Sequence, residues 1–359
     1  MWARTRFWLS TLLFSAGCLP ELEQIQGDRI LYEHSASLHP CAGNVEYLDR
    51  LIPFLEDHLL ATAPEPLRYA WLAPEDIIAT DATDEGEIRE GYAVSTHYAW
   101  SLDPILPHEL VHLVVGGHSS APFFKEGIAV AMDWFPLTNT GSRYVTGSIS
   151  PDFNPLSTLS ARGSASVNYA AAGLFVMYLL TRHGPARFRE FYRSLSWPFT
   201  TDRIAASFRA AFAADLHEEV AEFMQGSPPC AADDFALQAL ECSAPLHPWS
   251  KPWEWTLAAS TECDAPGVIG GIGPRGAWPS ARVVTVEVPQ DGRYVFGLFT
   301  SGQEWARLGP CFGCPWDDAD VLAEDGEVLH LDLKRGRYYI RVNGWSDEGH
   351  DVNVTLAVL

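Results

Sequence analysis

The sequence predicts an α+β protein in which a mainly helical domain with a small N-terminal sheet precedes an all-β sandwich domain. Up to about Met224, short stretches typical of strands come first and longer helical patterns follow. Beyond Trp253, apolar and polar residues alternate with a period of two, which is typical of strands with one buried face. A length of 359 residues and a hydrophobic fraction of 47% suffice for two packed domains.

Changes in composition along the chain predict the domain boundaries. We assign residues 1–18 to an export segment, 19–225 to the first domain, 226–253 to a linker and 254–359 to the sandwich. The linker assignment depends on the many prolines and two cysteines between residues 226 and 253.

The first 18 residues have the features of a bacterial export signal. Arg4 and Arg6 precede an apolar stretch from Phe7 to Ala16, which is too short to cross a bilayer. The residues that end at Cys18 resemble a lipoprotein cleavage box, although Ser15 stands where such boxes usually have Leu. We therefore expect an extracytoplasmic protein, either lipid-anchored through Cys18 or secreted without an anchor. No other membrane contact is expected.

Six further cysteines suggest up to three disulfides in an exported chain, with a pairing that the sequence leaves open. They are Cys41, Cys230, Cys242, Cys263, Cys311 and Cys314. The last two form a C-x-x-C pair, which can be a redox or zinc motif. Because no second C-x-x-C and no thioredoxin-like context accompany it, a structural loop is the preferred interpretation.

Three strands and one helix are predicted before residue 100. The strand patterns cover Ile30–Tyr32, Arg68–Leu72 and Gly91–Ser95, and a helical pattern covers Val45–Leu60. The strand at Gly91–Ser95 could pair with an extended peptide substrate.

Two helices are predicted next. Asp103 is a suitable N-cap and Pro104 a suitable first helical residue, and Gly116-Gly117 ends this helix. The second helix is expected from Pro122 to Trp134.

A third helix, Val167–Arg182, is apolar nearly all round and should be buried. Gly184 and Pro185 mark its end, and two more helices should follow up to about Met224.

The C-terminal strands are predicted from residues 284–288, 329–333 and 352–358, where apolar side chains occupy every second position. The pairs Asp291-Gly292 and Asp325-Gly326 are typical of hairpin turns. The chain contains 13 Trp, among them Trp253, Trp255 and Trp345. Core packing is the preferred role for these side chains, with stacking on sugar or peptide as the alternative.

One motif indicates a chemical function. His108-Glu109-Leu110-Val111-His112 is an H-E-x-x-H sequence on a predicted helix, so both imidazoles lie on one face, one turn apart. Glu109 flanks the same position and could accept a proton from metal-bound water. Glu126 follows His112 by 14 residues within Glu-Gly-Ile-Ala. Two His and one Glu are an established ligand set for catalytic Zn²⁺.

This combination of motifs resembles the gluzincin metallopeptidases, in particular the compact peptidase MA-like proteins, over about residues 28–225. The resemblance implies zinc ligands at His108, His112 and Glu126 and a general base at Glu109. It also implies an oxyanion-stabilising Tyr on a later helix, for which Tyr169 is the candidate. We expect the small residues after Glu126 to let its helix approach the first closely.

The sequence departs from the thermolysin-like pattern in one place. Val130 occupies the position, four residues beyond the third ligand, where those enzymes have an Asp. Asp133 could orient a ligand instead. His97 and His118 could line the cleft, but a structural role is preferred and both are excluded from the metal set. For Tyr169, core packing is the alternative to catalysis.

The strands at 329–333 and 336–342 resemble bacterial pre-peptidase C-terminal domains, which accompany secreted peptidases. We therefore expect a monomeric zinc endopeptidase that acts on peptides or proteins. An aminopeptidase and a non-catalytic surface-binding lipoprotein on a peptidase scaffold are the alternatives. Acidic residues outnumber basic ones 46 to 24, giving a net charge of −22, so nucleic acid is not an expected partner.

Overall fold

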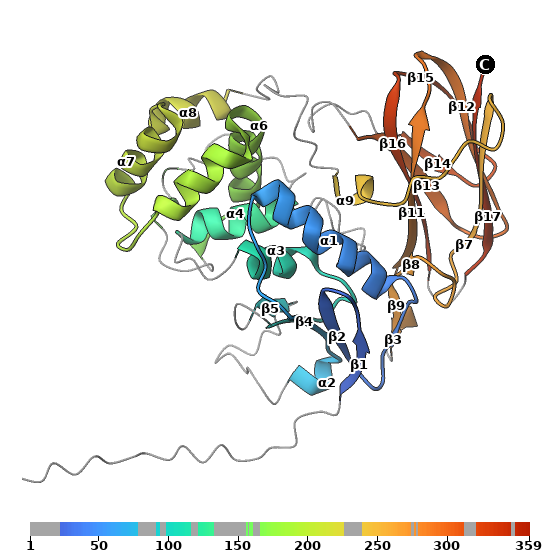
Figure 1. Cartoon of the computed structure of the whole chain (residues 1–359), viewed down its shortest axis with the longest axis horizontal. Coiled ribbons are helices and arrows are strands. Elements are labelled where there is room, and N and C mark those ends of the chain that lie inside the picture. The colour runs from blue at the N-terminus through green and yellow to red at the C-terminus, as the bar shows by residue number, and fades with distance from the viewer. Residues whose placement is uncertain are drawn as a thin grey trace, which may run out of the picture.

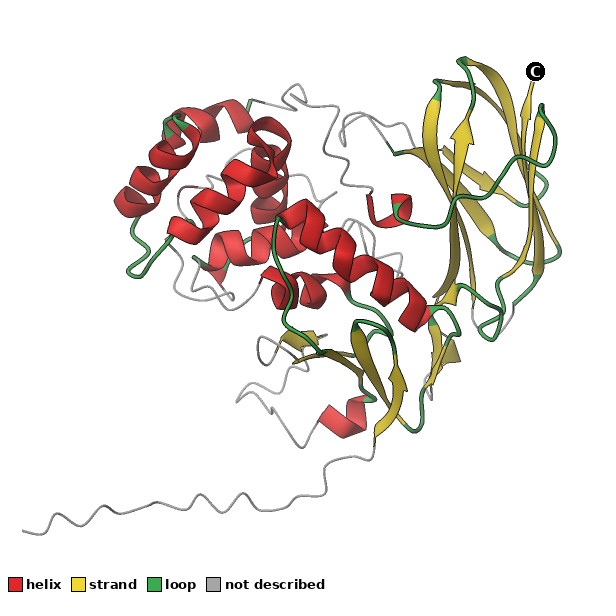
Figure 2. Cartoon of the chain, in the orientation of Figure 1, coloured by secondary structure: helices red, strands yellow, loops and turns green. Residues whose placement is uncertain are grey.

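The structure is a computed structural model that describes residues 22–77, 91–93, 98–115, 121–132, 156, 158–160, 166–225, 239–273, 276–277, 279–311, 321–345 and 349–359. It contains helices and several sheets, as an α+β fold requires. A group of helices and a small sheet form one part of the molecule, and two further sheets form a sandwich-like part (Figures 1 and 2). None of the helices in the described ranges is both long and apolar enough to cross a membrane.

The N-terminal sheet has five strands in the order β1-β2-β4-β6-β5. They are β1 (Leu22–Gln26), β2 (Ile30–Ser35), β4 (Leu67–Trp71), β5 (Gly91–Ala93) and β6 (Tyr98–Ser101). The three central strands are parallel, and the two edge strands are antiparallel to their neighbours. The three predicted strands are confirmed. β1 and β6 were missed because they are short and lack a clear apolar alternation.

Eight helices are described. They are α1 (Asn44–Leu59), α2 (Pro74–Ile77), α3 (Pro107–Val115), α4 (Pro122–Met132), α6 (Tyr169–Ser194), α7 (Thr201–Phe212), α8 (Leu216–Phe223) and α9 (Ala239–Cys242). The predicted helix Val45–Leu60 is confirmed to within one residue at each end. Its buried face, which includes Leu48, Leu51 and Leu55, repeats at the helical spacing and packs into the main core.

The predicted start of the next helix at Asp103 and Pro104 is wrong, because α3 begins at Pro107. A helix starting at Pro104 would need the amide of Pro107 to donate to the Asp103 carbonyl, and proline has no N–H. The carbonyls of Asp103 and Pro104 instead accept hydrogen bonds from the hydroxyls of Tyr69 and Tyr32, each 2.8 Å long. Pro107 therefore takes the first helical position itself.

The third predicted helix corresponds to the first half of α6. The side chain of Asn168 caps its N-terminus by accepting a hydrogen bond from the amide of Ala171. The helix breaks at Gly184, whose φ of 79° lies in the left-handed region, and Pro185 starts the second half. The predicted stop at this glycine and proline is confirmed, and α7 and α8 are the two further helices.

The C-terminal part consists of two facing antiparallel sheets. One has the order β14-β13-β16-β11-β8 and the other β15-β12-β17-β7. Their strands are β7 (Glu254–Ser260), β8 (Val268–Ile269), β11 (Pro279–Val288), β12 (Gly292–Thr300), β13 (Trp305–Pro310), β14 (Val321–Glu324), β15 (Val328–Leu333), β16 (Gly336–Trp345) and β17 (Asp351–Val358). Apolar side chains from both sheets form one core. Trp255 is fully buried in this core, whereas Trp253 and Trp345 are exposed. The predicted role in core packing is therefore wrong for Trp253 and Trp345.

The predicted linker is not a free connection over residues 239–253. These residues include α9, which contacts β11 and β16, and Leu246 bridges to Thr285 of β11. Trp249 donates a hydrogen bond to the carbonyl of Glu287. Residues 226–238, the other part of the predicted linker, lie outside the described residues.

Among the described residues, two disulfides hold distant segments together. Cys41 pairs with Cys263 across 222 residues of sequence, and Cys242 pairs with Cys311. Cys311 is thus part of a structural bond, as the structural interpretation of the C-x-x-C pair predicts. Cys230, Cys314 and the export segment with Cys18 lie outside the described residues. Disulfides are typical of extracytoplasmic proteins.

Segments from the two halves of the chain meet beside the first disulfide. β3 (His39–Pro40) pairs with β9 (Gly271–Gly273), which also pairs with β10 (Gly276–Ala277). The side chain of Asn44, at the start of α1, donates to the Gly270 carbonyl at 2.8 Å and accepts from the Gly270 amide at 2.9 Å. The C-terminal half therefore contacts the first domain through backbone pairing and side-chain hydrogen bonds.

Candidate metal centre

His108 and His112 occupy successive turns of α3, as the H-E-x-x-H spacing predicts. Their Nε2 atoms lie 3.2 Å apart, and the ring planes are nearly perpendicular. The side chains are only 11% and 7% exposed. Both imidazoles therefore present the same nitrogen to one small, largely buried volume.

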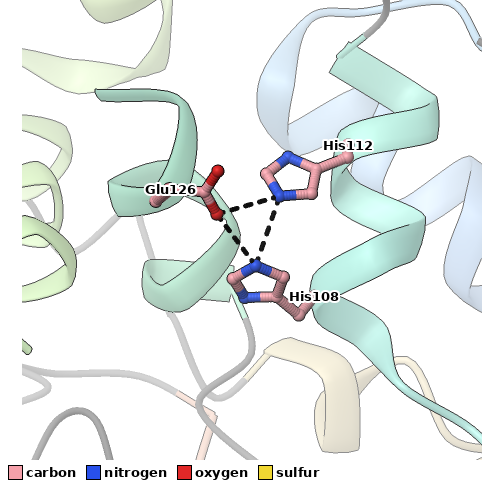
Figure 3. A group of neighbouring side chains, drawn as sticks. All are labelled: His108, His112 and Glu126. Carbon is pink, nitrogen blue, oxygen red and sulfur yellow. Dashed lines mark hydrogen bonds and ion pairs between the residues drawn. The ribbon is translucent and has the colours of Figure 1, made fainter. Parts of the chain in front are cut away.

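Glu126 reaches this volume from α4 (Figure 3). Its Oε2 atom lies 3.3 Å from the Nε2 atoms of both His108 and His112. The three donor atoms belong to the one group of three or more His, Cys, Asp and Glu side chains, within the described parts of the chain, that could share an ion. The three predicted ligands are thus brought together.

The geometry fits a tetrahedral zinc ion. Donor atoms about 2.05 Å from a tetrahedral zinc are about 3.3 Å from one another. The observed separations of 3.2 and 3.3 Å match this edge length. Hydrogen bonds alone fit less well, because two N–H groups directed at one oxygen would place their protons near each other.

The electrostatics of the group also suit a cation. Burial lowers the pKa of His112, so the neutral, metal-binding form is favoured. Burial alone would raise the pKa of Glu126, but hydrogen bonds from His108 and His112 bring it below its ordinary range. Glu126 is therefore a carboxylate facing two imidazoles.

Glu109 lies on α3 between the two histidines in sequence and is only 7% exposed. Its charge acts on both His112 and Tyr69 of β4 and raises the pKa of each. The predicted base is thus a buried carboxyl group beside the ligand cluster.

Tyr169 is the first residue of α6 and lies next to the cluster. The centroids of its ring and the His108 ring are 6.1 Å apart, with the planes tilted by 32°. The side chain is partly buried at the margin of the core. A catalytic role and a packing role are both compatible with this position.

The expected role of the small residues on α4 needs correction. A Cβ atom at Gly127 would lie 2.7 Å from the carbonyl oxygen of Ala172 in α6. A Cβ atom at Gly173 of α6 would lie 2.3 Å from Val130 of α4. Gly127 therefore permits close contact with α6, and not with α3 as predicted. Val130 is a buried contact in the same interface, which explains why an apolar residue stands there.

Other predicted residues are not placed. Asp133, His97 and His118 lie outside the described residues, and so do residues 94 and 95 of the predicted substrate-pairing strand. Sequence reasoning missed Tyr32, Tyr69 and Trp71, whose side chains contact the segment before α3. The only sequence signal for them is their position on predicted strands, which is common to many core aromatics.

Comparisons with known proteins assign no family to the chain. No protein family and no curated protein matches it. The pre-peptidase C-terminal domain of a Bacillus anthracis collagenase is 11% identical with a TM-score of 0.20, covering 32% of this chain and 93% of that one. The periplasmic lysozyme inhibitor PliG of Aeromonas hydrophila is 12% identical with a TM-score of 0.23, covering 32% and 97%. PliG of Salmonella Typhimurium is 17% identical with a TM-score of 0.21, covering 32% and 99%. Each covers about a third of this chain.

Proposed function

We propose that this protein is a zinc-dependent metallopeptidase of the gluzincin type that acts outside the cytoplasm. The observation that carries the proposal is the near-equilateral triangle of donor atoms from His108, His112 and Glu126, with edges of 3.2 and 3.3 Å. Glu109 and Tyr169 lie beside this triangle. Such hydrolases commonly combine two His and one Glu as zinc ligands with an adjacent carboxylate as general base.

Zinc, when bound, would lower the pKa of a water molecule towards about 7 and polarise the scissile carbonyl group. The carboxylate of Glu109 would accept a proton from that water and later deliver it to the leaving amine. A base at this position acts through its carboxylate oxygens, which the low exposure of Glu109 keeps away from bulk solvent.

Tyr169 would stabilise charge on the substrate. Its hydroxyl would donate a hydrogen bond to the carbonyl oxygen as that oxygen becomes negative. Removing one such donor typically costs about 3 kcal/mol of transition-state stabilisation. Its position beside His108, at the N-terminus of α6, supports this role.

The arrangement of the sheet supports a peptide as the substrate. Among the described strands, β5 is the last of its sheet, and it contacts α3, which carries His108 and His112. An extended chain can pair with an exposed strand edge through backbone hydrogen bonds. An extended peptide on this edge would pass close to the metal helix.

The test combines zinc analysis with peptide cleavage. We expect about one zinc per chain and cleavage of casein or of a peptide library. Glu109→Gln should retain zinc but lose activity by at least about 100-fold, because amide oxygen is a poor base. Glu126→Gln should weaken zinc binding. The exposed Glu190, on α6, provides a matched control, and Glu190→Gln should behave as wild type.

Three outcomes would contradict the proposal. A wild-type protein that binds no zinc would remove the metal centre. Full cleavage activity in Glu109→Gln would remove the proposed base. Zinc binding without cleavage of any peptide in the wild type would favour the non-catalytic surface-binding alternative.

A further inference from the structure

Three aromatic side chains of the N-terminal sheet hold the backbone segment that leads into α3. They donate hydrogen bonds to three consecutive carbonyl oxygens: Trp71 Nε1 to Leu102 at 2.9 Å, Tyr69 Oη to Asp103 at 2.8 Å, and Tyr32 Oη to Pro104 at 2.8 Å. All three side chains are fully buried, and the two tyrosine rings stack with centroids 5.8 Å apart. The segment before α3 is thus attached to the sheet at three consecutive residues, 102–104.

The attachment lies immediately before the ligands. α3 begins at Pro107, and His108 is its second residue. The direction of a helix follows from the position of its first turn, so fixing the carbonyls at residues 102–104 restricts where the His108 imidazole points. Metal ligands must be held within about 0.5 Å of their productive positions. The aromatic side chains provide such a restraint without touching the metal.

Two glycines of the C-terminal half support this aromatic group. Gly271 of β9 lies against the Trp71 indole, so closely that a Cβ atom there would be 2.3 Å from Cη2. Gly270 exchanges two hydrogen bonds with Asn44, which in turn interacts with the Tyr32 hydroxyl. Two routes therefore connect the residues beside the sandwich to the start of the metal helix.

We propose that Tyr32, Tyr69 and Trp71 are positioning residues of the metal centre, kept in place by Gly270 and Gly271. The inference rests on the proposed function in that His108, His112 and Glu126 bind zinc. It adds that the C-terminal half is part of the support of the centre and not only an attached binding domain.

Single variants of the whole chain test the inference. Tyr32→Phe and Tyr69→Phe each remove one hydroxyl that donates a hydrogen bond to the segment before α3. Tyr178→Phe is the matched control, because its equally buried hydroxyl donates to Glu219 of α8 at 2.7 Å. Gly271→Ala tests the second half of the proposal by forcing the Trp71 indole to move. The readouts are the zinc dissociation constant, the visible spectrum of the Co²⁺ form, and the urea midpoint.

We expect Tyr32→Phe, Tyr69→Phe and Gly271→Ala to raise the zinc dissociation constant about fivefold or more and to shift the Co²⁺ bands. Direct partners of metal ligands typically change affinity by about 10- to 100-fold, so a smaller effect is expected one step further away. Tyr178→Phe should lower the urea midpoint and leave both metal readouts unchanged. If the zinc dissociation constants of these three variants stay within about twofold of this control and their Co²⁺ spectra are unchanged, this inference is overturned and the proposed function still stands. A wild type without zinc affinity would overturn both this inference and the proposed function.

Discussion

At the residue scale, the ligand cluster places three polar side chains where water has little access. A buried carboxylate is costly unless hydrogen-bonded or paired, and Glu126 meets this need through two imidazoles at 3.3 Å. The two histidines, however, direct equivalent nitrogens at one oxygen. A divalent cation would accept a lone pair from all three groups at once, so burial of the cluster is compatible with metal binding.

A second buried carboxylate, Glu219 of α8, is satisfied without any metal. It accepts a hydrogen bond from the Tyr178 hydroxyl at 2.7 Å and lies 3.3 Å from His183 Nε2 and 3.4 Å from Arg182 Nε. Burial raises the pKa of Glu219, but His183, Tyr178 and Arg182, all on α6, together bring this pKa below its ordinary value. Arg182 also donates a hydrogen bond to Glu222 of α8. Glu219 therefore joins α8 to α6 in its charged form.

The sign of the resulting pH dependence follows from this direction. Since the pKa is lower in the folded state, the contribution of Glu219 to stability is complete above the unfolded value of about 4.3 and disappears as the pH falls through the folded value. We predict that the urea midpoint of wild type falls more steeply below about pH 5 than that of Glu219→Gln. Urea titrations at several pH values measure this. If the urea midpoints of the two proteins fall equally with pH, the prediction is contradicted. Glu218 is exposed, so Glu218→Gln is the control and should follow the wild type.

At the element scale, the contact between α4 and α6 holds Glu126, the third candidate ligand, in place. Glu126 projects from α4, while Gly127 and Gly173 let the two helices approach at a distance that side chains would prevent. The adjacent Val130 fills the space opposite Gly173. The position of the carboxylate thus depends on a contact outside the group formed by His108, His112 and Glu126.

We predict that Gly173→Ala destabilises the protein by about 1–3 kcal/mol, because overpacking a tight interface outweighs the better helix propensity of Ala. The same variant should weaken zinc binding, since α4 must shift. Thermal unfolding and zinc titration measure the two effects. Val130→Ala removes the Cγ1 atom that the new methyl group would meet at 2.3 Å and leaves the Cβ atom at 2.9 Å, so adding it to Gly173→Ala should recover part of the zinc affinity. Stability unchanged in the single variant would show that the interface has more room than these distances allow.

At the scale of the whole molecule, the two halves of the chain are joined by more than the connection between them. The Cys41–Cys263 disulfide, the pairing of β3 with β9 and the Asn44–Gly270 hydrogen bonds lie at one junction. α1 begins three residues after Cys41 and contacts α3. The junction is therefore connected to α3, which carries His108 and His112, through a single intervening helix.

We predict that replacing Cys41 and Cys263 by Ser lowers the unfolding free energy by about 3–5 kcal/mol, since the disulfide closes a loop of 222 residues. Calorimetry under oxidising conditions measures the change. Replacing the pair Cys242 and Cys311, which are 69 residues apart, should cost less in the chain-entropy description. A larger loss from the second pair would point to native-state strain or packing in place of loop closure.

Local features of this protein could be predicted from its amino-acid sequence. The spacing of His108 and His112 placed both on one helical face, because the period of a helix is independent of its surroundings. The alternation in residues 284–288, 329–333 and 352–358 located strands for the same reason. Gly184 and Pro185 marked a break in α6 through their backbone preferences. Each of these depends on residues close together in the chain.

Contacts between distant residues become known only from the folded structure. It bonded the carbonyls of Asp103 and Pro104 to tyrosines more than 30 residues away in sequence. It made α6 the neighbour of Gly127, paired the described cysteines and placed residues 239–253 against the sandwich. These outcomes depend on packing between segments that share no local signal, so the sequence pattern could name the candidate ligands but not the side chains that pack around them.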